Sequence, residues 1–477
     1  MKLQKYIWLL GLTGTALIIL VPLVLLWPKS DQAVDNPWAN VPERPPHTEH
    51  TDLFEGLTLE SGSDVTRACL KCHEDAAHQV MQTVHWTWES KPVQMAGRAE
   101  PITIGKKNAI NNFCIGISSN WSGCTKCHAG YGWSDENFDF SNAENVDCLI
   151  CHADPTTYAK GASGFPAKGV DLLVAAQSVG YPTRDNCGTC HFNGGGGNAV
   201  KHGDLDESLS NPEGSLDVHM GELNFQCTDC HQTKAHNITG RAISVSVDNA
   251  NQIYCTDCHN TAPHEDARVN AHLDTVACQT CHIPNTALED ATKVVWDWST
   301  AGQDIPEDPH FYLKIKGSFI YESNYQPQYF WYNGNVRYRY LWGDVIDPTQ
   351  TTPINTPAGD ITDPTAKIWP FKVHYAKQPY DTVYNYLVQP QTVGEYWVNF
   401  DWFTAITKGM ETIGLPFSGE YGFAETIMYW PQTHMVQPAE NALQCTACHA
   451  ENGEGRLDWL ALGYPGDPAE WGGRDTK

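Results

Sequence analysis

The chain has 477 residues and a formal net charge of −26, with 56 acidic and 30 basic side chains. This charge disfavours binding to nucleic acid and unassisted binding to anionic lipid, because both of those surfaces are negative. An anionic small molecule would therefore need a local group of Lys and Arg side chains.

The N-terminal segment is apolar. Residues 7–27 form a mostly apolar run with the length of a helix that crosses a bilayer. Trp8 and Trp27 would lie near the two interfaces, and residues 1–6 would form a cytoplasmic tail. A cleaved signal peptide is the alternative, but the run ends at Trp27-Pro28 without an Ala-x-Ala site. We expect a single-pass inner-membrane anchor, with the remainder of the chain on the periplasmic, extracytoplasmic side.

The pattern Cys-x-x-Cys-His occurs eight times and uses 16 of the 17 cysteines. On a helical turn, positions i, i+3 and i+4 share one face, so both thiols and the imidazole can meet one porphyrin. Zinc is disfavoured because a structural zinc site needs four ligands around one point. Each copy predicts covalent attachment of a c-type haem through two thioethers, with the His as iron ligand, so we expect eight such haems. The predicted attachment residues are Cys69, Cys72, His73, Cys124, Cys127, His128, Cys148, Cys151, His152, Cys187, Cys190, His191, Cys227, Cys230, His231, Cys255, Cys258, His259, Cys278, Cys281, His282, Cys445, Cys448 and His449.

The motifs divide the chain into regions. Residues 28–60 contain several prolines among polar side chains and predict an extended linker. Residues 61–282 hold seven motifs, with short helices and irregular loops expected between them, and residues 445–477 hold the eighth motif and a C-terminal tail. We therefore expect a mainly α multihaem cytochrome with much irregular structure and one N-terminal transmembrane helix.

Residues 283–444 differ from the rest because they contain no motif and hold 30 of the 52 aromatic residues. Without porphyrins, aromatic side chains must supply the buried surface. Asn333-Gly334 between two aromatic runs predicts a β-hairpin. We interpret this segment as a haem-free insert with minor β structure, serving as a scaffold or as a subunit interface in a homo-oligomer.

Twelve histidines lie outside the motifs, more than eight irons would need as second axial ligands. Three of them, His78, His236 and His264, follow a motif His by five residues and cannot reach the far face of the same iron. We expect these three to ligate neighbouring haems, whereas the alternative for any of them is a surface histidine. The further candidate ligands are His85, His202, His219, His272, His374 and His434.

Two features stand outside this pattern. Cys114 is the one cysteine that belongs to no motif, and residues 194–197 are four consecutive glycines followed by Lys201 and His202. The glycines allow a close approach of the backbone to a flat cofactor. By itself, however, a lone Cys is typical of a small buried residue, and a lone Lys is typical of a surface charge.

Several stretches resemble the octahaem tetrathionate reductase family of c-type cytochromes, and the resemblance covers roughly residues 50–477. It is based on residues 84–88 (Val-His-Trp-Thr-Trp), 105–108 (Gly-Lys-Lys-Asn), 111–114 (Asn-Asn-Phe-Cys), 128–133, 186–191, 194–204, 217–220 and 462–468. Members of that family have a lysine ligand at one haem and a free cysteine in the active site. The resemblance implies that Lys201 is this ligand, that Cys114 is this cysteine, and that the catalytic haem belongs to His128 and its motif. Whether Lys201 replaces His128 or lies opposite it stays open.

The resemblance implies a reductase that cleaves tetrathionate by two electrons and also accepts nitrite or hydroxylamine. A quinol dehydrogenase or a periplasmic cytochrome would supply the electrons, while Arg98, Lys106 and Lys107 would bind the anion. Two alternatives remain. One is a pure electron-transfer conduit in which every iron has two axial ligands, and the other is an oxidase of the hydroxylamine oxidoreductase type.

Overall fold

The computed structural model describes Thr15 and residues 36–113, 115–248, 250–450 and 454–474. The chain divides into two units, Met1–Glu43 and Arg44–Lys477. In the first unit, the described residues 36–43 form a turn and a short loop. The second unit contains all eight motifs and the aromatic-rich segment.

The predicted membrane anchor is not supported. A bilayer span needs about 20 residues of helix, whereas the longest described helix, α13 (Trp402–Ile413), has 12. Among the described residues no helix is long and apolar enough to cross a membrane. Residues 7–27, except Thr15, lie outside the described residues. The structure therefore does not support the predicted transmembrane helix or the inner-membrane localisation based on it.

The prediction of a mainly α fold is also wrong, because only 27 % of the structure is helical and the sheet is substantial. The helices are short, since many of them are little more than the turn that holds a motif. Those before the sheet are α2 (Gly62–Cys69), α3 (Ala76–Met81), α4 (Val84–Thr87), α5 (Trp121–Cys124), α6 (Leu149–His152), α7 (Leu172–Gln177), α8 (Arg184–His191), α9 (Cys227–Cys230), α10 (Ala267–Ala271) and α11 (Cys278–His282). After or beside the sheet lie α12 (Trp397–Asn399), α13, α14 (Cys445–Cys448) and α15 (Pro468–Trp471).

The aromatic-rich segment forms an eight-stranded mixed sheet. Its strands are β3 (Thr292–Asp297), β4 (Tyr312–Leu313), β5 (Gly317–Glu322), β6 (Gln328–Tyr332), β8 (Thr352–Pro353), β10 (Lys367–Asp381), β11 (Tyr386–Leu387) and β12 (Tyr421–Pro431). The order is β4-β5-β3-β10-β12-β8, with β6 and β11 also paired to β10. Two small two-stranded sheets pair β1 (Thr233–Lys234) with β2 (Asn237–Ile238) and β7 (Val336–Arg339) with β9 (Asn355–Pro357).

The Asn333-Gly334 turn does connect two strands, but the predicted hairpin does not form. Gly334 has φ +89°, as such a turn requires. The flanking strands β6 and β7 pair instead with β10 and β9. The Asn-Gly pair thus forms a turn as predicted, but β6 pairs with the long strand β10 and not with β7.

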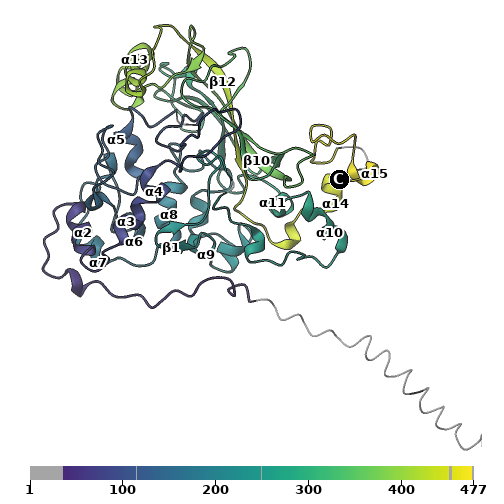
Figure 1. Ribbon diagram of the computed structural model, residues 1–477, viewed down its shortest axis with the longest axis horizontal. Coiled ribbons are helices and arrows are strands. Elements are labelled where there is room, and N and C mark those ends of the chain that lie inside the picture. The colour runs from purple at the N-terminus through teal and green to yellow at the C-terminus, as the bar shows by residue number, and fades with distance from the viewer. Residues whose placement is uncertain (1–14, 16–35, 114, 249, 451–453, 475–477) are drawn as a thin grey trace, which may run out of the picture. The chain divides into compact units, whose positions relative to one another are not determined.

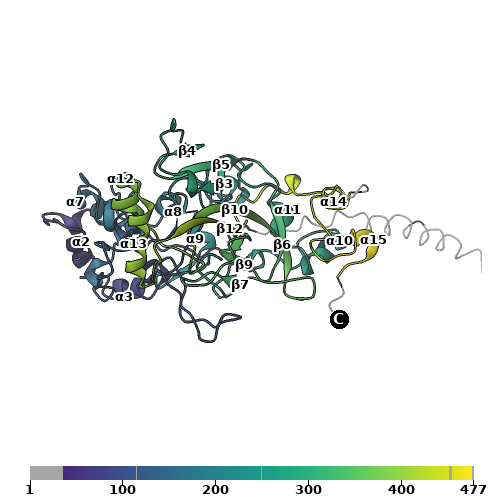
Figure 2. The same cartoon turned by 90° about the horizontal axis from the view of Figure 1, so that it is seen from above.

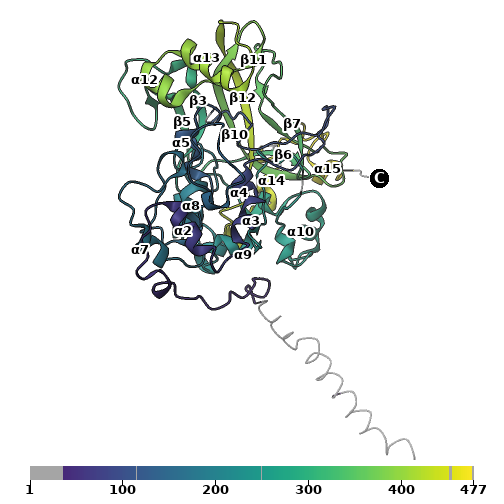
Figure 3. The same cartoon turned by 60° about the vertical axis from the view of Figure 1, so that its left-hand side comes forward.

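Strand β10 organises the second unit. In Figure 1 and Figure 2, β10 and β12 run through the middle, with α2 and α7 on one side and α10 and α14 on the other. Figure 3 shows α12 and α13 at the opposite end of the sheet from α9. β10 has 15 residues and pairs with β12 over 11 of them. Because the face of β10 that carries Lys372, His374 and Gln378 is almost entirely buried, the polar side chains on that face need partners inside the protein.

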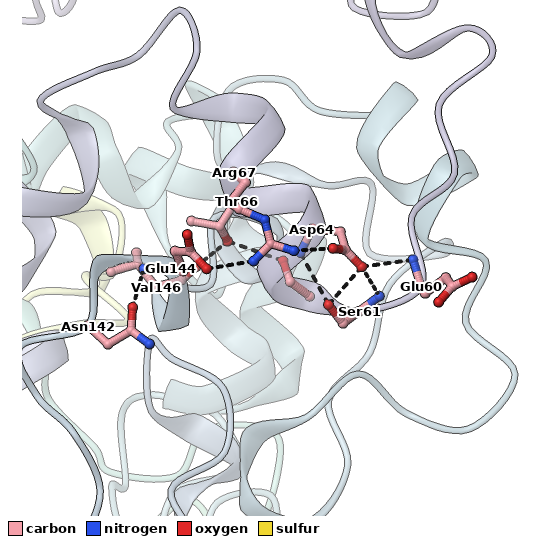
Figure 4. A network of polar contacts seen from close by, with 9 residues as sticks. Glu60, Ser61, Asp64, Thr66, Arg67, Asn142, Glu144 and Val146 are labelled. Atoms are coloured by element: carbon pink, nitrogen blue, oxygen red, sulfur yellow. Dashed lines mark hydrogen bonds and ion pairs between the residues drawn. The ribbon is translucent and has the colours of Figure 1, made fainter.

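The first and third motifs are joined by a polar network (Figure 4). Ser61 and Asp64 form a capping box at the start of α2, which ends in Cys69. Arg67 on this helix pairs with Asp64 and, at 2.5 Å, with Glu144. Thr66 donates to the carbonyl oxygen of Val146 at 2.7 Å, two residues before the third motif. A short helix that could not persist alone is thereby held by its cap and by its neighbour.

The four-glycine run packs against the segment that precedes Cys114. A Cβ atom on Gly195 would lie 2.6 Å from the ring of Phe113, and Gly195 has φ +81°. Phe113 and Val200 belong to one buried cluster with Trp296, Trp298 and Trp430 of the sheet. The glycines therefore allow close contact with another part of the chain.

We expect Gly195→Ala to lower the free energy of unfolding of the haem-loaded protein by about 1–3 kcal/mol, because the added methyl group both clashes and requires an unfavourable φ. Gly197→Ala is the matched control, since its Cβ would meet nothing closer than 3.5 Å and its φ is not positive. Denaturant unfolding of the two variants measures the difference. Equal stabilities would show that this contact contributes nothing.

Candidate functional site

Seven motif histidines each face a histidine from outside the motifs. The ring centroids of these pairs lie 6.0 to 6.5 Å apart, and the two members come from different segments of the chain. The pairs, in the order of the motifs, are His73–His50, His152–His236, His191–His85, His231–His434, His259–His219, His282–His264 and His449–His272.

This spacing fits one haem iron between two imidazoles. Two metal–nitrogen bonds of about 2.0 Å, together with the distance from nitrogen to ring centre on each side, place the centroids about 6 Å apart. The outer nitrogens are also held in place. His152 Nδ1 lies 2.9 Å from the Gly180 carbonyl, and His231 Nδ1 lies 2.8 Å from the Thr239 carbonyl. Such contacts fix the ring orientation and leave Nε2 for the metal.

The structure brings together most of the expected ligands. His85, His219, His236, His264, His272 and His434 each lie opposite a motif His. Among the described residues, His78, His202 and His374 face no motif ring: His202 packs on Trp430, and the buried His374 contacts Asn112. Sequence reasoning missed His50, which lies 6.4 Å from His73. His50 was overlooked because it lies in the predicted linker. The only signal in the sequence was that the histidines outside the motifs outnumber the irons that need a second ligand.

Thiol contacts connect the motifs with one another. Cysteines of different motifs lie close together and bring the first motif next to the third, the second next to the fourth, the fourth next to the fifth, and the sixth next to the seventh; the pairs are Cys69–Cys148, Cys127–Cys190, Cys187–Cys227 and Cys255–Cys278. The second motif therefore lies beside the fourth, which itself adjoins the fifth.

The second motif departs from the others at its histidine. In the first motif, for example, the His73 N–H donates to the Cys69 carbonyl at 3.0 Å, as in an α-helical turn. The His128 N–H donates instead to the Thr125 carbonyl at 2.9 Å, and His128 has extended backbone angles, φ −73° and ψ +142°. The imidazole therefore leaves the motif in another direction.

His128 is fully buried in an aromatic cage formed by Trp86, Trp88, Trp133, Phe138 and Phe140. Its Nε2 lies 2.7 Å from the Trp86 carbonyl oxygen and donates to it, while Nδ1 is buried without a partner among the described residues. Burial lowers the pKa of His128 to about 3. The Nε2 atom, which His152 and His231 leave for a metal, is thus bound to a backbone carbonyl in His128.

The backbone of His128 is held as firmly as its ring. Lys160 donates to the His128 carbonyl and, at 2.9 Å, to the Gly130 carbonyl. It also forms a buried ion pair with Asp147 at 3.0 Å, and Asp147 accepts hydrogen bonds from Tyr131 and Tyr158. A buried ion pair with satisfied partners resists local rearrangement.

Lys201 lies near the second and fourth motifs. Its ammonium is 5.1 Å from the Trp430 ring centre. Burial, together with the charge of Lys106, lowers its pKa to about 7, although Cys127 opposes the shift. Lys106 acts on His191 and Cys127 in the same way, so these groups share one region. A lysine with a lowered pKa loses its proton readily, as a metal ligand must.

Of the three cations expected to bind an anion, two are paired with carboxylates. Arg98 forms an ion pair with Asp344, and Lys107 pairs with Glu89 at 3.3 Å. Lys106 lies 5.0 Å from the Trp88 ring centre and has no carboxylate partner among the described residues. The unpaired positive charge near this site therefore comes from Lys106, because Lys201 loses its proton readily.

Cys114 lies outside the described residues. The residues before it are held by contacts with the backbone and side chains of β10 and with Arg339 of β7. Asn112 donates to the His374 carbonyl at 2.8 Å, and Gln378 donates to the Asn111 carbonyl at 3.3 Å. Arg339, fully buried, donates to the Ile110 carbonyl at 2.8 Å. The aromatic-rich segment thus supports the loop that leads to Cys114.

Family models match two parts of the chain. The model for bacterial cytochrome c matches residues 293–452, which include most of the aromatic-rich segment and the eighth motif together. The model for cytochrome c7 and related cytochromes c matches residues 213–283. An uncharacterised protein of Archaeoglobus fulgidus is 26 % identical over 242 residues, which cover 39 % of this chain and 79 % of that protein.

A solved structure is similar over most of the chain. The octahaem cytochrome c of Shewanella oneidensis is 48 % identical, with a TM-score of 0.83, covering 89 % of this chain and 98 % of that one. The protein thus has multiple covalently bound c-type haems, consistent with its eight motifs. The chain belongs to the multihaem c-type cytochromes and within them to the octahaem cytochromes c.

Proposed function

We propose that this octahaem cytochrome is a reductase, in which Lys201 replaces His128 as ligand at the haem of the second motif. The observation behind this proposal is the exception among the motif histidines. His128 alone faces no other histidine among the described residues, and its Nε2 donates to the Trp86 carbonyl. Lys201, with its lowered pKa, is near Cys127 of the same motif. A haem with an amine on one side retains an open position on the other.

The seven paired histidines would serve electron transfer. Iron held between two imidazoles exchanges single electrons, and an iron with an open position can bind a substrate. The contact between Cys127 and Cys190 supports passage of electrons from the fourth motif to the second. A quinol dehydrogenase or a periplasmic cytochrome would deliver these electrons.

Tetrathionate is the substrate we favour, with nitrite and hydroxylamine as others. Two electrons cleave the central S–S bond of the tetrathionate dianion, and two thiosulfate dianions leave. In a chain with a net charge of −26, such an anion needs local positive charge, which Lys106 supplies beside Trp88. The thiol of Cys114 would assist by exchange with the S–S bond.

Lys201→Met should alter the electron paramagnetic resonance signal of one haem and lower the tetrathionate kcat by roughly 100-fold or more, because the iron loses its amine ligand. The control is Lys126→Met, an exposed lysine within the same motif. If Lys201→Met leaves both the signal and the rate unchanged, Lys201 is not a ligand, and a conduit with eight doubly ligated irons becomes the better description.

Lys106→Met should raise the KM for tetrathionate about 10-fold, as expected for loss of one charged contact. The KM for hydroxylamine, which is largely uncharged at neutral pH, should change by less than about twofold. Lys107→Met is the matched control, because Glu89 already neutralises that charge. An equal effect of the two variants on tetrathionate would contradict the role of Lys106.

His50→Ala should convert one low-spin haem to high spin, because the haem of the first motif would lose its second axial ligand. His78→Ala should leave all spectra unchanged, since His78 faces no motif ring among the described residues. Magnetic circular dichroism of the oxidised proteins distinguishes the two variants. A high-spin haem in His78→Ala but not in His50→Ala would show that His78, predicted from its spacing to a motif histidine, is a ligand and that His50 is not.

A further inference from the structure

Two buried side chains of the sheet contact the backbone around Lys201. Thr292 begins β3, Lys372 lies in β10, and both are fully buried. The Lys372 ammonium donates to the carbonyl oxygens of Val200 at 2.9 Å and Lys201 at 3.2 Å. The Thr292 hydroxyl lies 2.6 Å from the Ala199 carbonyl and 2.9 Å from the His202 carbonyl. Four successive carbonyls, 199 to 202, therefore lie against two side chains of the sheet, and the carbonyls of Ala199 and His202 share the single Thr292 hydroxyl hydrogen.

The hydrogen bonds of Lys372 leave no donor free. An ammonium has three N–H groups, and the third donates to the Thr292 hydroxyl oxygen. No carboxylate among the described residues lies within ion-pair distance of Lys372. A fully buried lysine without an ion pair is costly. Two of its donors bind the loop around Lys201, and the third binds Thr292, which contacts the same loop. Lys372 therefore holds this loop against the sheet.

The loop depends on these contacts because it has no regular structure of its own. Residues 193–206 form no helix or strand, and Ala199 has φ +56°. Backbone carbonyls in such a segment need partners from elsewhere when they are buried. The register of the sheet places Lys372 directly opposite Trp430 of β12, the residue whose ring Lys201 approaches. Backbone and side chain of Lys201 are thus both positioned by the same pair of strands.

We propose that Thr292 and Lys372 are positioning residues for Lys201, which fix the backbone from which its amine reaches the haem of the second motif. This inference rests on the proposed function, because it presumes that Lys201 is the ligand. It assigns to the aromatic-rich segment a direct part in the ligand set of one haem. Neither residue would touch the substrate.

The test is Thr292→Val compared with Thr292→Ser in the haem-loaded protein. Valine has nearly the same shape but no hydroxyl, whereas serine keeps it. We expect Thr292→Val to shift or split the resonance signal of the lysine-ligated haem, with eight haems bound and the other signals unchanged. The kcat should fall about 10- to 100-fold, the range usual for loss of a contact to a metal ligand. Thr292→Ser should restore both the signal and the rate.

Lys372→Met is the second variant, on a different strand, in case Thr292→Val does not fold. Its control is Lys377→Met, on the same strand, since Lys377 donates no hydrogen bond to residues 199–202 in the described part of the chain. If Thr292→Val or Lys372→Met lowers thermal stability but leaves the signal of that haem unchanged, the two residues only stabilise the fold and the inference is overturned. If Lys201→Met itself leaves the signal unchanged, the assignment of the ligand fails instead.

Discussion

Pairs of imidazole rings separated by 6.0 to 6.5 Å impose the main constraint on this fold. The rings do not touch, so the pairs by themselves contribute little packing energy, and the gap between them has the size of one metal ion with its two bonds. Several of them join distant segments, such as His231 with His434 and His152 with His236. Binding of the haems and folding of the chain should therefore be coupled, because the cofactor completes contacts that the polypeptide leaves open.

The sheet supplies what the haem-bearing loops lack. Along β10 the side chains of Lys372, His374 and Gln378 lie on one face and are all fully buried. Polar groups in such a position need hydrogen-bond partners, and they find them in the loops around Asn112 and Lys201. A strand that would ordinarily be apolar thus fixes two loops at once. Through these contacts the aromatic-rich segment supports the candidate site directly.

One motif shows how far identical sequences can differ in structure. His128 and the seven other motif histidines follow the same two cysteines at the same spacing. In the second motif the backbone turns out of the helix at His128, and five aromatic rings with the Trp86 carbonyl receive the imidazole. Burial there stabilises the neutral ring, and Lys160 holds the carbonyl of the same residue. Side chains that precede and follow the motif in the chain thus set the orientation of the His128 ring.

The sequence by itself determined the haem attachment sites, because their chemistry is local: two thiols and an imidazole on one turn are read directly from the spacing. It also identified six of the paired histidines, and it singled out Lys201 and Cys114 by resemblance. It did not find His50, it proposed His78, which faces no motif ring among the described residues, and it predicted a mainly α fold where the aromatic segment builds a sheet. Only the tertiary structure decided which histidine faces which motif, which carbonyl the His128 ring contacts, and how Thr292 and Lys372 hold the loop of Lys201. These contacts join residues from 18 to 203 positions apart, as in His264–His282 and His231–His434. No local pattern encodes them, because they depend on burial and on the register of strands that the chain reaches only when it is folded.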